Sequence, residues 1–534
     1  MTEITLETRT CTQCSTSFAI TDVDQQFLDT LTPTIGGKQY GLPRPTLCPL
    51  CRKYQRLAWR NEKKLYKRTC DGTGKDMISL FPPTARNPIY SVPYWNSDSW
   101  DAKDYGKIYD FSRSFFEQFG SLIREVPLPG GSIGPWVENS DYTSGCSWTK
   151  DSYLTFSVNE SQKIYYSVDV VSCSDAMDCL GIMNCENCYE CIEVYDSYDI
   201  MYAYHVHDSR NSRFLLDSTG CSDCYGCFGL QGASYHIYNT PYTESQYKQK
   251  LAEIQSSSIS EQKRMFREFY TGKYLKNPLP NTGSENVIES ENVIESKNVS
   301  FSRHIRWAED IRHSQKYQIP GAHLCMDSTS IWGNASKIYS TYQWFHNSHD
   351  IYFSASNFNE VSHLFYCAYC RNGTHDCFGC VWLHHGESYC ILNKQYTKDE
   401  YEKLVEKIIK KMMDDGEWWA FFPASLSPHG YDDSVCQLLR PLTKEQAEKE
   451  GFSWSGYEAP FPKVEKVIPA SKLPENISEI PDDILNWAIE CEVTKKPFRI
   501  IAQELEFYRR HDLPIPRRHP DTRYEERTKW YINY

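Results

Sequence analysis

Two C-x2-C pairs near the N-terminus have the residue type and the spacing of a metal site. Cys11 pairs with Cys14, Cys48 pairs with Cys51, and residues 15–47 separate the pairs. Each pair can supply two thiolates from one tight backbone turn, and zinc prefers four such ligands in a tetrahedron. A catalytic zinc keeps one position open for water, whereas thiolate fills all four positions here. We therefore expect a structural zinc ion, with four buried thiols as the alternative.

Further cysteines occur in pairs and triplets along the middle of the chain. C-x2-C-x2-C runs begin at Cys185 and Cys221, without the fourth Cys and Pro of the bacterial iron–sulfur run. The best second metal site would be formed by Cys367, Cys370, Cys377 and Cys380. Because these cysteines take the apolar place of a repeat, we favour a ladder of buried thiols acting as small hydrophobes. Cys70 stays unassigned, since it lacks the second cysteine of a pair.

A basic stretch, residues 52–68, follows the second cysteine pair. On a helix, most of its cations would face away from the stripe of Tyr54, Leu57 and Leu65. A cationic helix with aromatic neighbours suits phosphate contact and base stacking. The candidate nucleic-acid contacts are Arg52, Lys53, Arg56, Arg60, Lys63 and Lys64. The alternative is a solvated face that offsets the negative charge of a four-thiolate centre.

The sequence contains none of the catalytic motifs that carry a mechanism of their own. The nucleophile elbow, the phosphate-binding loop, the dinucleotide fingerprint and HExxH are all missing. The net charge of −13 argues against indiscriminate coating of nucleic acid, which needs a positive surface. We therefore assign no catalytic residue and expect a zinc-binding interaction or scaffold protein with a protein or nucleic-acid partner. A β-solenoid sugar lyase or hydrolase is the alternative, because such sites use scattered carboxylates.

A six-residue repeat in the middle of the chain predicts the elements that carry the cysteine pairs there. From Ser284 the sequence reads SENVIE, SENVIE, SKNVSF, SRHIRW, AEDIRH and SQKYQI. The fourth place holds Val287, Val293, Val299, Ile305, Ile311 and Tyr317, and a small residue stands three places earlier. A period of six returns one side chain per repeat to the same face of a strand, as in a β-solenoid core. The left-handed hexapeptide β-helix is one candidate, although its small residue usually stands four places after the aliphatic one.

A longer duplication indicates two solenoid halves. Residues 224–247 match residues 377–401 with one inserted residue. In both copies a Ser-Tyr-x-Ile-x-Asn strand precedes Tyr-Thr and a helix. The helix starts carry capping-box pairs, Thr243 with Gln246 and Thr397 with Glu400. We expect each half to end in a helix that covers the open end of the stack.

The two ends of the chain also match one another. Residues 491–500 are similar to residues 11–20, and residues 513–530 are similar to residues 42–59. In the C-terminal copy, three of the four cysteines are replaced, by Thr494, His519 and Thr522. We expect this copy to keep the fold and to have lost the metal.

These motifs carry a family resemblance. Residues 11–52 resemble small bacterial treble-clef zinc-binding domains through C-x2-C-x3-F-x-I, Gln25-Gln-Phe, Pro45 and CPLCR. Residues 489–523 resemble a degenerate copy through CEVTKKPF, QELEFY and LPIPRRHPD. The whole arrangement is similar to bacterial proteins that join such a finger to cysteine-rich β-solenoid repeats. The resemblance implies zinc binding and no known reaction.

Composition and hydropathy indicate the fold class and the location of the protein. Aromatic residues make up 14% of the 534 residues, which favours β structure. No apolar run is long enough for a transmembrane helix, and the first residues do not resemble a signal peptide, so we expect a cytoplasmic protein with reduced cysteines and no membrane partner.

The predicted fold is mainly β with α. The segments are a treble-clef or zinc-ribbon domain with a basic helix (1–70), a Trp/Tyr-rich connection (71–135), two β-solenoid halves with capping helices (136–275 and 284–415) and a C-terminal region with a degenerate finger (416–534).

Overall fold

The chain divides into two units, each built from two separate stretches of sequence. Unit 1 comprises Met1–Gly130 and Pro278–Tyr457, and unit 2 comprises Gly131–Asn277 and Glu458–Tyr534. The region predicted as one C-terminal segment, 416–534, is therefore shared between the units. The computed structural model describes residues 3–61, 63–131, 134, 136–273, 283–288, 290–294, 296–300, 303–306, 309–312, 348–353, 360–458, 460–461 and 464–533.

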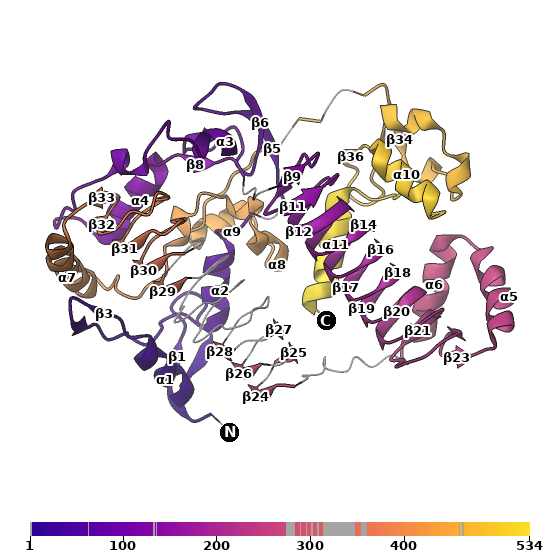
Figure 1. The fold of residues 1–534 in the computed structure, drawn as a ribbon, viewed down its shortest axis with the longest axis horizontal. Coiled ribbons are helices and arrows are strands. Elements are labelled where there is room, and N and C mark those ends of the chain that lie inside the picture. Colours follow the sequence, from indigo (N-terminus) through magenta and orange to yellow (C-terminus); the bar gives the residue numbers. More distant parts are fainter. Residues whose placement is uncertain are drawn as a thin grey trace. The chain divides into compact units, whose positions relative to one another are not determined.

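Unit 2 is built on a β-solenoid, which confirms that part of the sequence prediction (Figure 1). Its sheet has 15 strands. Val168 pairs in parallel with Leu180, and Ser174 pairs with Glu186, so residues twelve positions apart stack on successive turns. The stacked strands are β9 (Val137–Glu138), β10 (Thr143–Ser144), β11 (Ser147–Lys150), β12 (Thr155–Tyr165), β13 (Val168–Val171), β14 (Ser174–Met177), β15 (Leu180–Met183), β16 (Glu186–Tyr189), β17 (Ile192–Tyr195), β18 (Tyr198–Met201), β19 (Tyr204–His207), β20 (Arg210–Thr219) and β21 (Tyr225–Phe228).

The solenoid core is filled by every third residue, not by one residue in six. Its apolar members include Val158, Ile164, Val170, Cys173, Ala176, Cys179, Ile182, Cys185, Cys188, Cys191, Val194 and Ile200, all buried. Ser161, Ser167 and Ser197 keep the same spacing and are also buried. One turn therefore consists of two six-residue repeats on opposite walls, and each repeat places two side chains inside. The sequence pattern revealed the larger period because only one of these two positions is regularly aliphatic.

Left-handed backbone conformations produce the three-residue spacing. The residue before an inward side chain repeatedly has a positive φ, for example Asp199 (51°) before Ile200 and Asn187 (57°) before Cys188. Asp and Asn adopt this conformation more readily than most L-residues, because their short side chains can hydrogen-bond locally. The segment Ser197-Tyr-Asp-Ile200 therefore has two inward residues, Ser197 and Ile200, with the left-handed Asp199 before the second.

The second solenoid half lies in unit 1 and uses two turn lengths. Glu285 pairs with Lys297, twelve positions on, whereas His349 pairs with Ser362, thirteen positions on. The predicted sixth repeat, with Tyr317, lies outside the described residues. The strands are β24 (Glu285–Ile288), β25 (Glu291–Ile294), β26 (Lys297–Ser300), β27 (Arg303–Arg306), β28 (Glu309–Arg312), β29 (His349–Tyr352), β30 (Ser362–Phe365) and β31 (His375–Phe378).

Both halves end in the same way, which explains the sequence duplication. A short hairpin closes each stack, β22 (His236–Ile237) with β23 (Thr240–Pro241), and β32 (Cys390–Ile391) with β33 (Lys394–Gln395). The predicted helices follow as α5 (Glu244–Gln255) and α7 (Lys398–Asp414), each with its capping box present. Asn239 and Asn393, the last residues of the matching strand motif, both bond a backbone N–H and C=O of the preceding turn.

The N-terminal part of unit 1 contains short strands and two helices around the four cysteines. They are β1 (Thr5–Thr10), β2 (Ser17–Thr21), α1 (Asp22–Leu31), β3 (Thr34–Ile35), β4 (Lys38–Gln39) and α2 (Pro49–Leu57). A hairpin follows, of β5 (Tyr66–Thr69) and β6 (Asp76–Ser79), and then β7 (Ile89–Tyr90), α3 (Val92–Trp95), α4 (Phe115–Glu125) and β8 (Leu128–Pro129). Farther along the chain, α8 (Val435–Leu439) and α9 (Lys444–Lys449) belong to the same unit.

Unit 2 is completed by α6 (Ile259–Tyr270) and by the C-terminal elements. The latter are β34 (Lys466–Pro469), β35 (Trp487–Glu490), β36 (Pro497–Phe498), α10 (Ala502–Arg510) and α11 (Pro520–Asn533).

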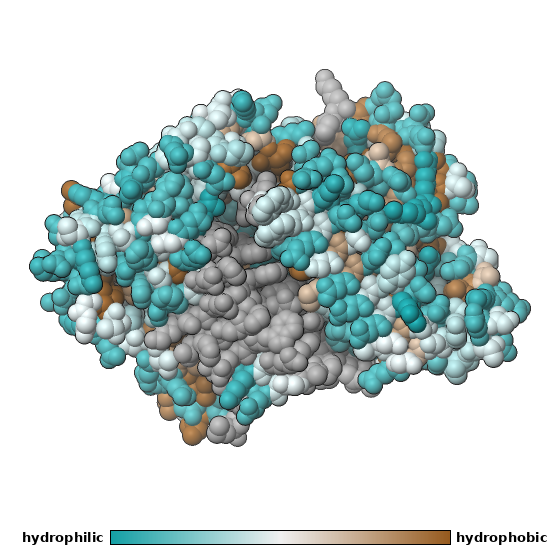
Figure 2. Space-filling model, in the orientation of Figure 1, coloured by the Kyte–Doolittle hydropathy of each residue, from teal (hydrophilic) through white to brown (hydrophobic). Residues whose placement is uncertain are grey.

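On the visible face, hydrophobic residues form small separate areas among hydrophilic ones (Figure 2). In the described ranges, no helix has both the length and the apolar character needed to cross a bilayer.

Candidate metal centre

The four N-terminal cysteines come together as predicted. The sulfur atoms of Cys11, Cys14, Cys48 and Cys51 all lie within 4.8 Å of one another. The Sγ atoms of Cys14 and Cys48 are 3.7 Å apart. A tetrahedral ion about 2.3 Å from each sulfur places the sulfurs about 3.8 Å apart, so this distance fits a metal at the centre. The four residues could therefore hold a metal ion.

A hairpin turn and a helix start supply the two pairs. The turn between β1 and β2 carries the first pair, with Cys11 N–H bonded to Thr16 O (2.9 Å) and Ser15 N–H bonded to Cys11 O (3.0 Å). Ser15 has a φ of 60°, which lets the chain reverse within this short turn. Cys48 precedes α2 as its N-cap, with Pro49 at the first helical position, where proline fits well. Three of the cysteines are buried, and only Cys14 is exposed.

The protonation of these thiols responds to two opposing influences. Hydrogen bonds from the side chain and backbone of Thr16 lower the pKa of Cys14 to about 6. Burial raises the pKa of Cys51 and of Cys48 above the ordinary value. A metal ion binds thiolates, so its binding would release protons from the buried Cys48 and Cys51. The positive charge of the ion would then stabilise the two buried thiolates.

The basic stretch does not form one long cationic helix. Helix α2 ends at Leu57 and buries Arg52 and Arg56, while Arg60, beyond its end, is also buried. Of the other candidate contacts, Lys53 and Lys63 are half-buried and Lys64 is exposed, with its Nζ 3.0 Å from an Asp433 oxygen. Beyond the helix, Asn61 Nδ2 donates to Lys64 O and Leu80 O. The expectation that most of these cations face away from the core is wrong for the three arginines.

The cysteines of the second solenoid half are arranged along the core. Cys367, Cys370, Cys377 and Cys380 are fully buried. Each thiol lies within hydrogen-bonding distance of the carbonyl two residues earlier, for example Cys377 Sγ to His375 O at 3.2 Å. Among the described residues, these four sulfurs do not form a group within 4.8 Å as the N-terminal ones do. Burial raises the pKa of Cys370 and of Cys380.

The backbone turn of the first cysteine pair, here called the knuckle, recurs at two further places among the described residues. In the β5–β6 turn, Cys70 N–H bonds to Lys75 O (2.8 Å) and Gly74 N–H bonds to Cys70 O (2.8 Å). In the C-terminal copy, Cys491 N–H bonds to Lys496 O (3.0 Å) and Lys495 N–H bonds to Cys491 O (3.1 Å). Ser15, Gly74 and Lys495 share the positive φ at the same place in the turn. The repeat at Cys70 was only hinted at in the sequence, by Cys-x2-Thr in place of Cys-x2-Cys.

The C-terminal copy also brings the substituted ligand positions together. Cys491 Sγ lies 3.9 Å from Thr522 Oγ1, and Thr494 N–H donates to the same sulfur at 3.5 Å. Hydrogen bonds from Thr494 and the backbone of His519 outweigh burial and lower the pKa of Cys491 to about 7. The geometry of the first centre thus persists where threonine has replaced cysteine.

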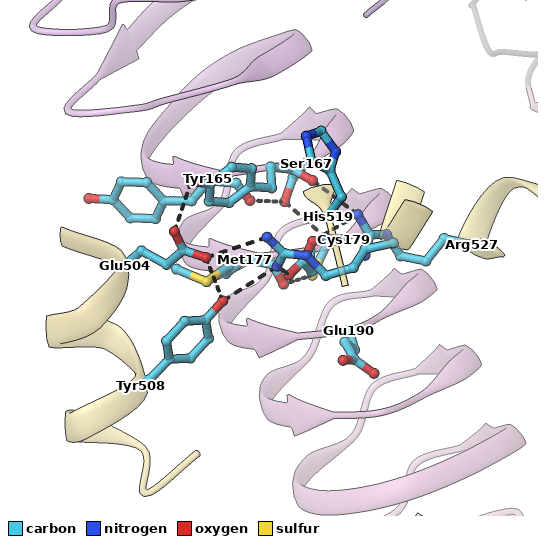
Figure 3. Close-up of polar contacts among 12 residues, drawn as sticks. Tyr165, Ser167, Met177, Cys179, Glu190, Glu504, Tyr508, His519 and Arg527 are labelled. Carbon is cyan, nitrogen blue, oxygen red and sulfur yellow. Dashed lines mark hydrogen bonds and ion pairs between the residues drawn. The ribbon is translucent and has the colours of Figure 1, made fainter. Parts of the chain in front are cut away.

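A buried polar network holds this copy against the solenoid of unit 2 (Figure 3). Arg523 pairs with Asp178 of the solenoid, and Arg527 Nη2 lies 2.9 Å from the same carboxylate. Glu504 accepts hydrogen bonds from Tyr166 and Tyr508, both at 2.8 Å. Burial raises the pKa of Glu504 despite the nearby Arg523. Buried, paired charges thus link α10 and α11 of this copy to the solenoid.

Comparisons with known proteins assign no family to the chain. No protein-family model matches the sequence. No curated protein matches it either. Among solved structures, one match is a candidate acetyltransferase from Desulfovibrio desulfuricans G20, 9% identical, covering 49% of this chain and 68% of that chain with a TM-score of 0.11. At this TM-score the likeness says nothing about the fold or the function of this chain.

A second group of metal-ligating atoms lies in unit 1 and was not found from the sequence. Donor atoms of His349, Asp350 and His363 all lie within 4.8 Å of one another. His349 and Asp350 are adjacent in the sequence, but their closeness to His363 depends on the thirteen-residue turn. A search at that spacing would have found it.

Proposed function

We propose that this protein is a zinc-binding scaffold whose solenoid presents a rigid surface to a macromolecular partner. The observation that carries the proposal is the closed set of four thiols at Cys11, Cys14, Cys48 and Cys51. Four thiolates leave no position for a substrate or a water molecule, so the ion would stabilise the module and perform no chemistry. Zinc is the metal that such a set binds most commonly in proteins.

The resemblance to bacterial treble-clef proteins with cysteine-rich repeats is part of the same proposal. A knuckle, a hairpin and a ligand at the start of a helix are the elements that such a finger uses. The described cysteines form no disulfide. We also propose a cytoplasmic location, where the four N-terminal thiols would stay reduced and able to bind a metal.

A protein partner fits the charges better than nucleic acid does. The net charge is −13, and three of the six candidate phosphate contacts are buried. Contact with phosphates requires accessible cations. The surface we propose for the partner is an open groove of about 940 Å³ along the unit 2 solenoid, with Trp148 and Tyr198 among its lining residues. Exposed aromatic side chains are common at the centres of protein interfaces.

The same groove supports a second candidate function, a carbohydrate-active enzyme. Trp148 lines the groove and stacks with the neighbouring Trp136, with ring centroids 5.7 Å apart; both are exposed, which suits a sugar ring. Asp196 and Asp208 line the groove on successive turns. Paired strands lie about 4.8 Å apart, and glycosidases that retain configuration use two carboxylates at about 5 Å. Hydrolysis of a polysaccharide that is abolished in Asp208→Asn would favour this function over the scaffold.

Native mass spectrometry tests the zinc centre. We expect one tightly held zinc ion in the full chain and its loss in Cys48→Ser. The matched control is Cys70→Ser, which changes a knuckle cysteine without a four-thiol set and should keep the ion. Retention of the ion in Cys48→Ser, or an ion other than zinc in protein from zinc-sufficient cells, would overturn the assignment.

A binding measurement on the groove tests the scaffold. Trp148→Ala combined with Tyr198→Ala should abolish association with a purified protein partner and leave the zinc content and the unfolding curve unchanged. Val467→Ala is a matched control, since Val467 is an exposed apolar side chain of unit 2 that does not line the groove. Equal affinity of the double variant and the wild type would exclude this surface.

A further inference from the structure

We propose that His349, Asp350 and His363 form a second metal site, for a divalent transition ion that prefers imidazole and carboxylate ligands. His349 Nδ1 lies 3.1 Å from Asp350 Oδ2, and His363 Nε2 lies 3.6 Å from the same oxygen. The two imidazole rings are 5.2 Å apart and nearly perpendicular, at 84°. Two nitrogens and one oxygen therefore converge on one small volume.

The distances fit a shared ion. Ligand atoms about 2.1 Å from one metal lie about 3.0–3.4 Å apart when they subtend tetrahedral or octahedral angles. The 3.1 Å separation lies inside this range, and the 3.6 Å separation lies slightly above it. Two histidines with one carboxylate form a set that binds zinc, iron(II), cobalt or nickel in proteins. A hydrogen-bonded His–Asp pair alone would not bring in the second imidazole.

The solenoid itself fixes the three side chains. His349 and Asp350 belong to β29, and His363 belongs to β30 on the next turn. Asp350 and His363 both have left-handed backbones, with φ of 52° and 50°. Residues at the same corner of successive turns stack, so Asp350 and His363 are neighbours even though thirteen positions separate them. The ligands thus stand on strands, which position side chains more firmly than loops do.

The following turn supplies a partner for one of the ligands. Asp376 occupies the same corner one turn on, and its Oδ1 is 3.4 Å from His363 Nδ1. A histidine that binds a metal through one ring nitrogen usually donates its other N–H to a carboxylate. Asp376 would therefore hold the His363 tautomer that leaves Nε2 facing Asp350.

A pocket adjoins the site and leaves room for further ligands of the ion. It has a volume of about 350 Å³ and is lined by Asp350, His363 and Asp376 together with Tyr389, Lys398 and Glu402. Three protein ligands fill half of an octahedron, so water or a small anion could complete the set. Three acids of the lining, Asp350, Asp376 and Glu402, outnumber Lys398, whose Nζ lies 4.0 Å from Glu402 Oε1, so the pocket favours a metal cation. The site thus differs from the closed four-thiol centre in being open.

Cobalt(II) titration tests the site in full-length protein that carries a single zinc ion, held by the four-thiol centre. We expect one further ion to bind per chain, with an absorption spectrum that lacks the intense sulfur-to-cobalt bands of a thiolate centre. Asp350→Asn keeps a residue that tolerates the left-handed backbone, so it should fold while weakening cobalt binding at least about tenfold. His363→Ala should do the same, and Asp376→Asn should weaken binding by a smaller factor. The matched control is His236→Ala, a histidine of the other solenoid outside the site.

Each outcome decides the proposal. Binding that is lost in Asp350→Asn and in His363→Ala but kept in His236→Ala supports it. No binding below millimolar cobalt, or equal binding in wild type and Asp350→Asn, overturns it. Because the four-thiol centre stays loaded with zinc throughout, failure here is distinguishable from failure of the zinc scaffold, which native mass spectrometry reports separately.

Discussion

The backbone N–H of Cys48 donates a hydrogen bond to the Sγ atom of Cys11, at 3.3 Å. The start of α2 is thereby tied to the β1–β2 turn by the protein itself. The backbone N–H of Ser91, the residue before α3, makes the corresponding bond to Cys70 Sγ at 3.1 Å. A helix start facing a knuckle cysteine is therefore a recurring unit of this chain, and a full set of metal ligands is present in only one of its described copies.

The C-terminal copy should regain a metal when its ligands are restored. We predict that the triple variant Thr494→Cys/His519→Cys/Thr522→Cys binds one more zinc ion than the wild type. The reason is that Cys491 Sγ and Thr522 Oγ1 already lie 3.9 Å apart, close to the spacing of two zinc ligands. Native mass spectrometry measures the gain. The matched control is the triple change of the same positions to serine, which should gain none. An unchanged zinc content in a folded cysteine variant would show that the copy does not share the geometry of the first centre.

Serine should replace an inward cysteine of the solenoid at little cost. Cys173 Sγ bonds to Val171 O and accepts the N–H of Cys185, and Ser161 makes the same two bonds one turn earlier. We predict that Cys173→Ser changes the free energy of unfolding by less than about 1 kcal/mol, whereas Cys173→Leu lowers it by about 1–3 kcal/mol through overpacking. Denaturant unfolding measures both. Loss of a bound metal in Cys173→Ser would contradict the reading of these thiols as core residues.

The buried network on Asp178 should be needed for the C-terminal copy to stay docked. Asp178→Asn keeps a residue suited to the left-handed backbone at this position but removes the carboxylate charge that Arg523 and Arg527 share. Arg523 keeps Glu504, whose Oε1 is 3.4 Å from its Nη2. We predict a loss of about 3–5 kcal/mol in the free energy of unfolding, with earlier proteolysis of residues 464–533. Asp175→Asn is the control, since Asp175 is also left-handed and pairs with the exposed Arg510 at 2.7 Å. That pair should contribute less than about 1 kcal/mol, and equal losses in the two variants would count against a special role of Asp178.

The stability of unit 1 should fall in mild acid because of His429. This side chain is buried and stacked on Phe81, with ring centroids 4.6 Å apart, and burial lowers its pKa to about 3. The unfolded chain takes up a proton near pH 6.5 and the folded chain does not, so stability is fully present above pH 6.5 and is lost as the pH falls toward 3. Between pH 7.5 and pH 5, we predict that the free energy of unfolding falls by about 2 kcal/mol less in His429→Phe than in the wild type.

The comparison for this prediction is made at both pH values. Phe81→Leu removes the stacking partner and should lower the stability without changing its pH dependence through His429. Unfolding curves of the three proteins at pH 7.5 and pH 5 give the difference directly. The same slope in His429→Phe and in the wild type would disprove the assignment.

The sequence predicted features that depend on local spacing and missed those that depend on distant contacts. The Cys11 and Cys48 pairs, the capping boxes at Thr243 and Thr397 and the solenoid are all encoded within short stretches. The three-residue spacing of the core was not recognised, because inward positions alternate between aliphatic residues and Ser or Cys, so that only a period of six is apparent. Burial of Arg56 beside the second cysteine pair could not be predicted, because a run of cations at helical spacing looks the same on a solvated face and in a polar interior. His363 reaches Asp350 only through a turn that is one residue longer than the repeat.

The stacking of nearly identical turns has a mechanical consequence. Each turn of the unit 2 solenoid bonds chiefly to the turns before and after it, so a load along the chain would open the stack one turn at a time. Releasing twelve residues would lengthen the chain by about 40 Å at each step. At the C-terminal end of this solenoid, such a load would first have to separate the β22–β23 hairpin, which Asn239 bonds to the preceding turn. A protein built in this way can yield gradually under tension without losing its remaining turns.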